Sequence, residues 1–149
     1  YDPQEPFRTQ LAGGIDSAVG FIRYDRPQGK FISTEEMSRD VVPRTSSEKW
    51  HEMVRLYDAE IAFVDSQVGA LVRELQRRNL YDDTIVIVTA DHGELFGEHG
   101  LATHFKALTE EELHVPLIVR YPPGIPKGTR VTTPVELVDI LPTVLDFVE

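Results

Sequence analysis

Cysteine is absent from this sequence of 149 residues. Its absence excludes a disulfide framework, a thiolate nucleophile and a zinc site built on cysteine ligands. Positive charge is also scarce, because 15 lysine and arginine residues stand against 25 acidic residues and leave a net charge of -10. This balance, with no basic cluster, argues against nucleic acid or an anionic membrane as a partner. An anionic substrate would need a bound metal or a few individually placed cations.

Long apolar runs are missing as well. The runs at 84–90 and 115–119 are far shorter than the roughly 20 residues that span a bilayer, so we expect no membrane partner. The sequence opens at Tyr1 without methionine or a signal-like pattern, which indicates a chain cut from a longer one. Its length and its 41% hydrophobic content fit one domain over residues 1–149.

The first third of the chain carries weak patterns. Residues 1–15 contain two prolines and a pair of glycines, which predicts a loop or an extended lead-in. We expect a strand over 18–24, and a short helix that begins near Ser33 and ends before Pro43.

One long amphipathic helix is the strongest prediction, over residues 46–78. Thr45 and Glu48 fit a capping box at its start, and Asn79 suits its end. At 1.5 Å per residue it would be about 50 Å long, and such a helix normally lies against a large sheet. Its apolar residues recur at steps of three and four: Trp50, Met53, Val54, Tyr57, Ile61, Val64, Val68, Leu71, Val72 and Leu75.

Two unbroken apolar runs predict strands on either side of a polar segment. They cover 84–90 and 117–121 and have the composition of strands buried on both faces. Asp139 can cap a final helix that runs to Val148. The order helix, strand, loop, strand, helix predicts an α/β layered fold with a mostly parallel or mixed sheet, on which the long helix packs.

A carboxylate and an imidazole follow the first of these strands directly, as Asp91 and His92 before Gly93. Ligands of open α/β sheets bind beyond the carboxyl ends of strands, and a turn at Gly93 can direct both side chains toward one point. Carboxylate and neutral imidazole are usable ligands for calcium, manganese or zinc. The alternative is structural, with Asp91 capping the loop and His92 bonded to backbone.

Four segments resemble the sulfatase family in the family's own order. In chain order they are the long helix around 57–69, the strand with its ligand loop at 84–100, the approach to the next strand at 108–119, and the helix start at 138–143. The resemblance covers about 46–148. It implies an alkaline-phosphatase-like fold, a divalent metal that is usually calcium, and a formylglycine nucleophile made from cysteine or serine in a Cys/Ser-x-Pro-x-Arg motif.

Carried onto this sequence, the resemblance implies that Asp91 and His92 are metal ligands. Many sulfatases have asparagine where this chain has His92, so manganese and zinc stay open beside calcium. His104 matches a position where relatives place a histidine or lysine near the transferred group, as a charge stabiliser or general acid. Lys106 competes for that role. The alternatives are an exposed loop histidine and a solvated surface lysine.

The family's nucleophile motif and its N-terminal acidic ligands are missing from these 149 residues. The resemblance therefore implies the C-terminal portion of a catalytic domain, which needs the N-terminal part of the same polypeptide and is inactive alone. We expect a sulfuric-ester hydrolase acting on a small sulfate ester. A phosphodiester or phosphonate hydrolase, or a phosphoglycerol transferase of the same superfamily, stays open, as does a non-catalytic binding module.

Overall fold

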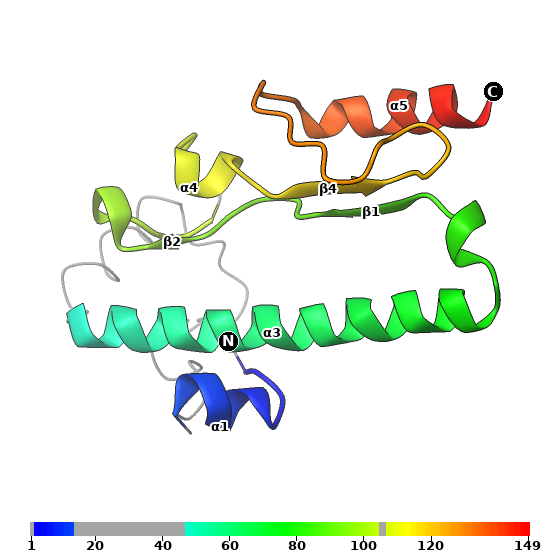
Figure 1. Cartoon of the computed structure of the whole chain (residues 1–149). Helices are drawn as coiled ribbons and strands as arrows, with labels where there is room; N and C mark the ends of the chain where they lie inside the picture. Colours follow the sequence, from blue (N-terminus) through cyan, green and yellow to red (C-terminus); the bar gives the residue numbers. More distant parts are fainter. Residues whose placement is uncertain (1, 14–46, 105–106) are drawn as a thin grey trace, which may run out of the picture.

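The computed structural model describes residues 2–13, 47–104 and 107–149. The expected strand over 18–24, the short helix near Ser33 and the cap at Thr45 lie outside these residues. In chain order the helices and strands are α1 (Phe7–Ala12), α3 (Ser47–Arg77), η3 (Tyr81–Asp83), β1 (Val86–Thr89), β2 (Leu95–Phe96), η4 (Glu98–Gly100), β3 (Ala102–Thr103), α4 (Glu110–Leu113), β4 (Leu117–Arg120), η5 (Leu137–Asp139) and α5 (Ile140–Val148), as Figure 1 shows.

The long helix is confirmed, because α3 runs over Ser47–Arg77 where the periodic pattern predicts 46–78. Asn79 ends it in a left-handed conformation with φ of 57°. The backbone N–H of Asn79 donates to the Gln76 carbonyl at 3.0 Å, and that of Leu80 donates to the Leu75 carbonyl at 2.9 Å. This pair of bonds satisfies carbonyls that the last turn of a helix otherwise leaves open.

The lead-in predicted for residues 1–15 is wrong, because the chain forms helix α1 there. Pro6 stands just before the first turn, and Gly13 ends the helix with φ of 66°. The residues that indicate a loop therefore bound a short helix instead. Helix α1 packs across α3, where Ala12, Leu56 and Ala59 are fully buried.

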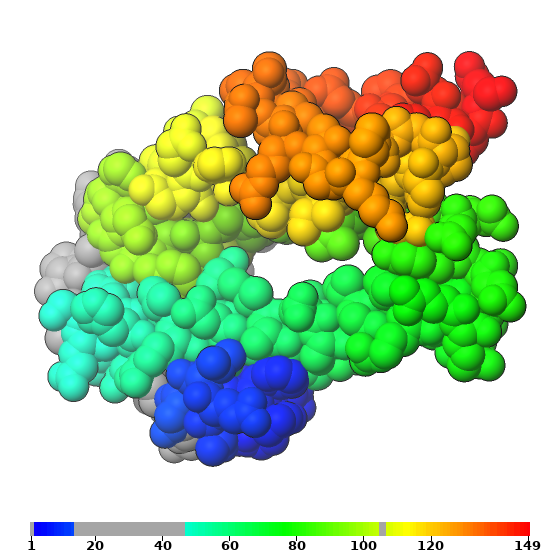
Figure 2. Space-filling model, in the orientation of Figure 1, coloured from blue at the N-terminus to red at the C-terminus, as the bar shows by residue number. Residues whose placement is uncertain are grey.

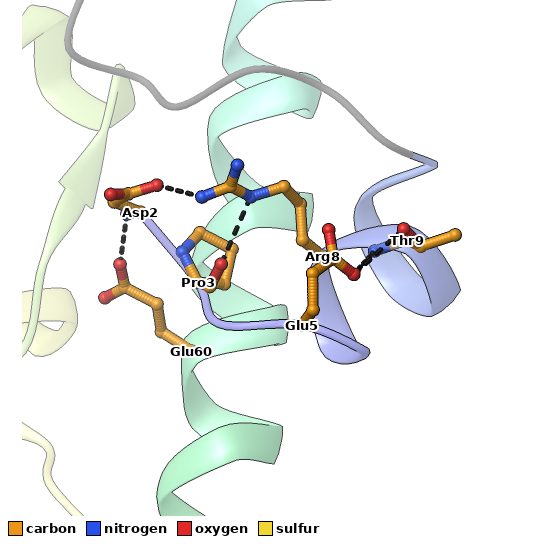
Figure 3. A network of polar contacts seen from close by, with 6 residues as sticks. All are labelled: Asp2, Pro3, Glu5, Arg8, Thr9 and Glu60. Carbon is orange, nitrogen blue, oxygen red and sulfur yellow. Dashed lines mark hydrogen bonds and ion pairs between the residues drawn. The ribbon is translucent and has the colours of Figure 1, made fainter.

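Polar contacts at the start of the chain also connect it to α3 (Figure 3). The backbone N–H of Asp2 donates to the Glu60 carboxylate, and Arg8 forms an ion pair with Asp2. Arg8 Nε also donates to the Pro3 carbonyl at 3.1 Å. Exposed pairs of this kind contribute at most about 1 kcal/mol each, so the buried apolar contact of α1 is the main attachment.

The two predicted strands form β1 and β4, and they pair with each other. They run antiparallel, with Val88 opposite Ile118. Both strand pairs in the described residues are antiparallel, so the mostly parallel sheet is not found there, whereas a mixed sheet accommodates this pairing. The segment between β1 and β4 doubles back through a small hairpin and α4, without the crossover helix that parallel neighbours need.

Helix α5 lies on the β4 side of the strand pair (Figure 1). The Tyr121 ring, just after β4, stacks on Phe147 of α5 with centroids 4.5 Å apart, and its hydroxyl donates to the Phe147 carbonyl at 2.8 Å. The strands are not buried on both faces in the described structure, since Val86 is half-buried and Ile118 is 62% exposed. Each of these two strands has only one partner strand among the described residues, which leaves its other edge unpaired there.

Helix α3 runs below the strands in Figure 1, and it contacts β2. Tyr57 of α3 meets Phe96 of β2 edge to face at 5.2 Å. Figure 2 shows an opening between the middle of α3 and the segments above it. On α3 the apolar side chains of Ile61, Val64 and Leu71 are between 52% and 59% exposed. No helix in the described ranges is both long and apolar enough to cross a membrane.

Candidate metal and substrate site

Asp91 and His92 converge at the carboxyl end of β1. The Asp91 Oδ1 atom accepts a hydrogen bond from the backbone N–H of His92 at 3.0 Å. The other carboxylate oxygen, Oδ2, lies 3.5 Å from His92 Nε2. The side chain of Asp91 is 88% exposed and that of His92 is 29% exposed, so the pair meets at the surface. The predicted convergence of an acid and an imidazole at a strand tip is present in the structure.

The ring of His92 is oriented by its own loop. Its Nδ1 lies 2.8 Å from the Gly93 carbonyl, which can only accept a hydrogen bond, so Nδ1 is the donor. In the neutral ring the lone pair is then on Nε2, the atom that faces Asp91 Oδ2. A carbonyl that fixes the tautomer in this way is the usual second partner of a metal-binding histidine.

Gly93 allows the ligand loop to lie directly against α4. Its backbone N–H donates to the Glu112 carbonyl at 2.8 Å. A Cβ atom at this position would lie 1.8 Å from the Glu111 carbonyl oxygen, so no other residue fits without a backbone shift. The glycine after the Asp–His pair therefore serves close packing.

The donor set fits a divalent cation in kind but not in number. A carboxylate oxygen and an imidazole nitrogen suit calcium, manganese or zinc. Within residues 2–13, 47–104 and 107–149 no group of three or more potential side-chain ligands occurs. A calcium ion takes about six to eight ligands, so the described residues supply only part of a coordination shell.

His104 joins this pair from the end of β3. Its ring lies over the ring of His92, with centroids 4.2 Å apart and planes inclined by 33°. Its Nδ1 lies 3.3 Å from the Glu94 carboxylate. Of the two candidates for contact with the transferred group, His104 lies beside His92. Lys106 lies outside the described residues.

Glu94 is the neighbour that the sequence analysis missed. Its side chain is only 12% exposed, and it lies close enough to α3 to influence Tyr57. Burial and then the nearby Glu94 carboxylate raise the pKa of the Tyr57 phenol above its ordinary value, with smaller contributions from Glu60 and Asp58. The sequence carries no clear signal for this contact, because it depends on the register of a hairpin with two residues in each strand.

A sequence model of the Sulfatase family matches residues 23–149. The chain belongs to the sulfatase family. It is 37% identical over 99 residues to an N-acetylglucosamine-6-O-sulfatase of Bacteroides thetaiotaomicron, a match that covers 66% of this chain and 18% of that protein. The sulfatase chain spans about a fifth of the length of the curated relatives that it matches.

Two solved structures resemble the described fold. One was determined in complex with its substrate, D-glucosamine-2-N,6-O-disulfate; its TM-score is 0.61 at 29% identity, over 79% of this chain and 31% of that one. The other is a phosphonate monoester hydrolase from Silicibacter pomeroyi, with a TM-score of 0.62 at 28% identity, over 95% of this chain and 24% of that one. These likenesses confirm the alkaline-phosphatase-like α/β fold.

Proposed function

We propose that this chain supplies two metal ligands and a substrate-contacting residue to a sulfuric-ester hydrolase. The observation that carries the proposal is the approach of Asp91 Oδ2 to His92 Nε2, at 3.5 Å, directly after strand β1. With its proton on Nδ1, the neutral His92 ring presents an acceptor nitrogen to a carboxylate oxygen. Two acceptors side by side favour a cation between them.

Calcium is the first candidate for that cation, with manganese and zinc as alternatives because one ligand is an imidazole. Asp91 would provide most of the charge attraction and His92 a directional nitrogen. When bound, a divalent ion polarises an ester oxygen and stabilises the charge that develops during cleavage.

His104 is placed to contact the transferred group. Its Nδ1 is bonded to Glu94, and the proposed contact with substrate is made through Nε2. In the imidazolium form, the Nε2 proton can be donated to a leaving oxygen or to a negatively charged sulfate oxygen. Lys106 is the second candidate for this contact, two residues further along the chain.

We infer that the active site is completed by further polypeptide and that the 149 residues alone are inactive. The sequence holds no cysteine and no Ser-x-Pro-x-Arg motif from which formylglycine could form. The curated relatives are about five times as long as the region matched. The apolar side of α3 at Ile61, Val64 and Leu71 is more than half exposed, as expected for a surface that packs against additional chain.

A phosphonate or phosphodiester hydrolase is the second candidate. His92 allows it, because an imidazole ligand suits manganese or zinc as well as calcium. The phosphonate monoester hydrolase of Silicibacter pomeroyi matches 95% of this chain, which adds support. A non-catalytic binding module is the third possibility.

Hydrolysis by the complete polypeptide tests these functions. The rates with p-nitrophenyl sulfate, p-nitrophenyl phenylphosphonate and bis-p-nitrophenyl phosphate are compared at saturating calcium, manganese or zinc. We expect the sulfate ester to have the highest kcat/KM, and Asp91→Asn or His92→Ala to lower it about 100-fold or more. Asp146→Asn, an exposed carboxylate on α5, is the matched control and should retain full activity.

The outcomes separate the candidates. A higher kcat/KM for the phosphonate or the phosphodiester would replace the sulfatase with the second candidate. Absence of hydrolysis with all three substrates and all three metals, in a folded complete polypeptide, would favour the binding module. Full activity of the Asp91→Asn variant would contradict the assigned ligand role.

A further inference from the structure

We propose that Glu94 is a positioning residue that orients His104, a role that rests on the proposed function of His104. The hairpin register provides the first observation. Leu95 pairs with Thr103 and Phe96 with Ala102, so the next cross-strand pair in the same register is Glu94 with His104. Directly opposite side chains in an antiparallel pair are close enough to interact, about 4.5 to 5.5 Å between Cβ atoms.

The contact between these two side chains is the second observation. His104 Nδ1 lies 3.3 Å from Glu94 Oε2. An ionised carboxylate can only accept, so the proton of this hydrogen bond is on Nδ1. The Glu94 side chain is 12% exposed and that of His104 is 36% exposed, so the acceptor is largely buried and the ring reaches the surface.

Two energetically unfavourable features beside this contact provide the third observation. The second carboxylate oxygen, Glu94 Oε1, is buried without a hydrogen-bond partner in the described part of the chain. Thr103, the residue before His104, has a left-handed backbone with φ of 67°, which is unfavourable for a β-branched residue. A buried acceptor without a donor and a strained residue both destabilise a fold, and such features gather at functional sites.

These observations give Glu94 a specific effect on the site. Its carboxylate fixes the Nδ1–H tautomer of neutral His104 and limits rotation of the ring, which already lies over His92 at 4.2 Å. In the neutral ring, Nε2 is then the acceptor nitrogen, through which the proposed contact with substrate is made. A carboxylate that orients a functional histidine through its other nitrogen is a general means of preorganisation.

Histidine NMR on the 149-residue chain tests the proposal without requiring activity. Long-range proton–nitrogen correlation spectra are recorded at alkaline pH, where the rings are neutral, for the wild type and for Glu94→Leu. We expect wild-type His104 to be mainly the Nδ1–H tautomer, and Glu94→Leu to shift the tautomer ratio about tenfold toward Nε2–H. The tautomer of His92 should stay unchanged, because its Nδ1 donates to the Gly93 carbonyl.

Further variants control this experiment. Glu111→Leu removes a similar carboxylate that contacts His99 at 3.2 Å on the same side of the fold, and it should leave His104 unchanged. Glu94→Gln keeps an acceptor oxygen and should retain most of the Nδ1–H tautomer, whereas Glu94→Ala removes the acceptor and gives the answer if Glu94→Leu does not fold. A wild-type His104 in the Nε2–H form, or a ratio that Glu94→Leu leaves unchanged, would overturn the proposal.

In the complete polypeptide, Glu94→Leu should lower kcat about 10-fold to 100-fold with unchanged metal affinity, and Glu94→Gln should recover much of it. The two proposals fail differently. If Asp91→Asn leaves metal binding and activity intact, the proposed function fails regardless of Glu94. If Asp91→Asn lowers metal binding and activity but Glu94→Leu leaves the His104 tautomer ratio unchanged, only the positioning role of Glu94 is wrong.

Discussion

The ring of His104 lies over the ring of His92, with centroids 4.2 Å apart and planes inclined by 33°. The two residues are twelve positions apart in the sequence and come from different segments, the loop after β1 and the end of β3. A proposed metal ligand and a proposed substrate contact therefore share one cluster built within this chain. The Asp91 carboxylate lies 3.5 Å from His92 Nε2, and the Glu94 carboxylate lies 3.3 Å from His104 Nδ1.

Gly93→Ala should destabilise the chain by about 1–3 kcal/mol, because the new methyl group would collide with the Glu111 carbonyl 1.8 Å away. Gly69→Ala is the matched control within α3. Its Cβ would meet only the flexible end of Arg73 at 3.3 Å, so helix propensity should raise stability by about 0.5–1 kcal/mol. Urea denaturation measures both. Equal changes of the same sign would contradict the close packing of the ligand loop on α4.

Stability at alkaline pH should depend on Tyr57. Burial and the Glu94 carboxylate raise the pKa of its phenol above 10.0, so the folded protein favours the neutral form. The stability contributed by this preference is fully present below about pH 10 and is lost as pH rises through the raised value. Tyr57→Phe should reduce the loss of stability in that range.

The sequence holds five tyrosines, so the tyrosinate absorbance of the wild type minus that of Tyr57→Phe measures the titration of Tyr57. Glu94→Gln should lower the pKa of Tyr57 toward its ordinary value, because it removes a nearby negative charge. A Tyr57 titration that is identical in the wild type and in Glu94→Gln would show that the two side chains are not neighbours.

A substitution on the exposed side of α3 should change stability less in the 149-residue chain than in the complete polypeptide. Val64 is 56% exposed, so Val64→Lys should change the stability of the 149-residue chain by no more than about 0.5 kcal/mol. In the complete polypeptide the same change should cost about 2 kcal/mol or more, because a covered valine would be replaced by a charge. Gln67→Lys, at an exposed polar position of the same helix, should be neutral in both. Equal effects of Val64→Lys in the two proteins would contradict the proposed covering.

Strong local patterns made much of the fold predictable. The apolar repeat of α3 continues for many turns and Asn79 suits its end, so the predicted bounds differ from the observed ones by one residue at each end. The runs of β-branched residues predicted β1 and β4, but composition does not encode strand direction. Helix α1 was missed because six residues carry too little periodic signal, and tertiary burial of Ala12 against α3 stabilises it.

The candidate site also contains residues that the sequence predicts and one that it does not. Asp91 and His92 were predictable because they are adjacent and follow a strong strand signal. Glu94 was not, because its contact with His104 depends on the register of a hairpin with two residues in each strand. That register is set by the turn at 97–101, where Gly97 and the non-glycine residue His99 both have positive φ. A left-handed histidine is not apparent from sequence pattern alone.

Line broadening by manganese tests the central claim most directly, that Asp91 and His92 bind a divalent cation together. Paramagnetic Mn²⁺ broadens NMR signals near even a weak site, which suits a chain that supplies only two ligands. It is titrated into the isotope-labelled 149-residue chain and into Asp91→Ala. We predict that the signals of Asp91, His92 and His104 broaden first in the wild type and persist in Asp91→Ala. Broadening that begins instead at Glu110–Leu113, or that is unchanged in Asp91→Ala, would contradict the account.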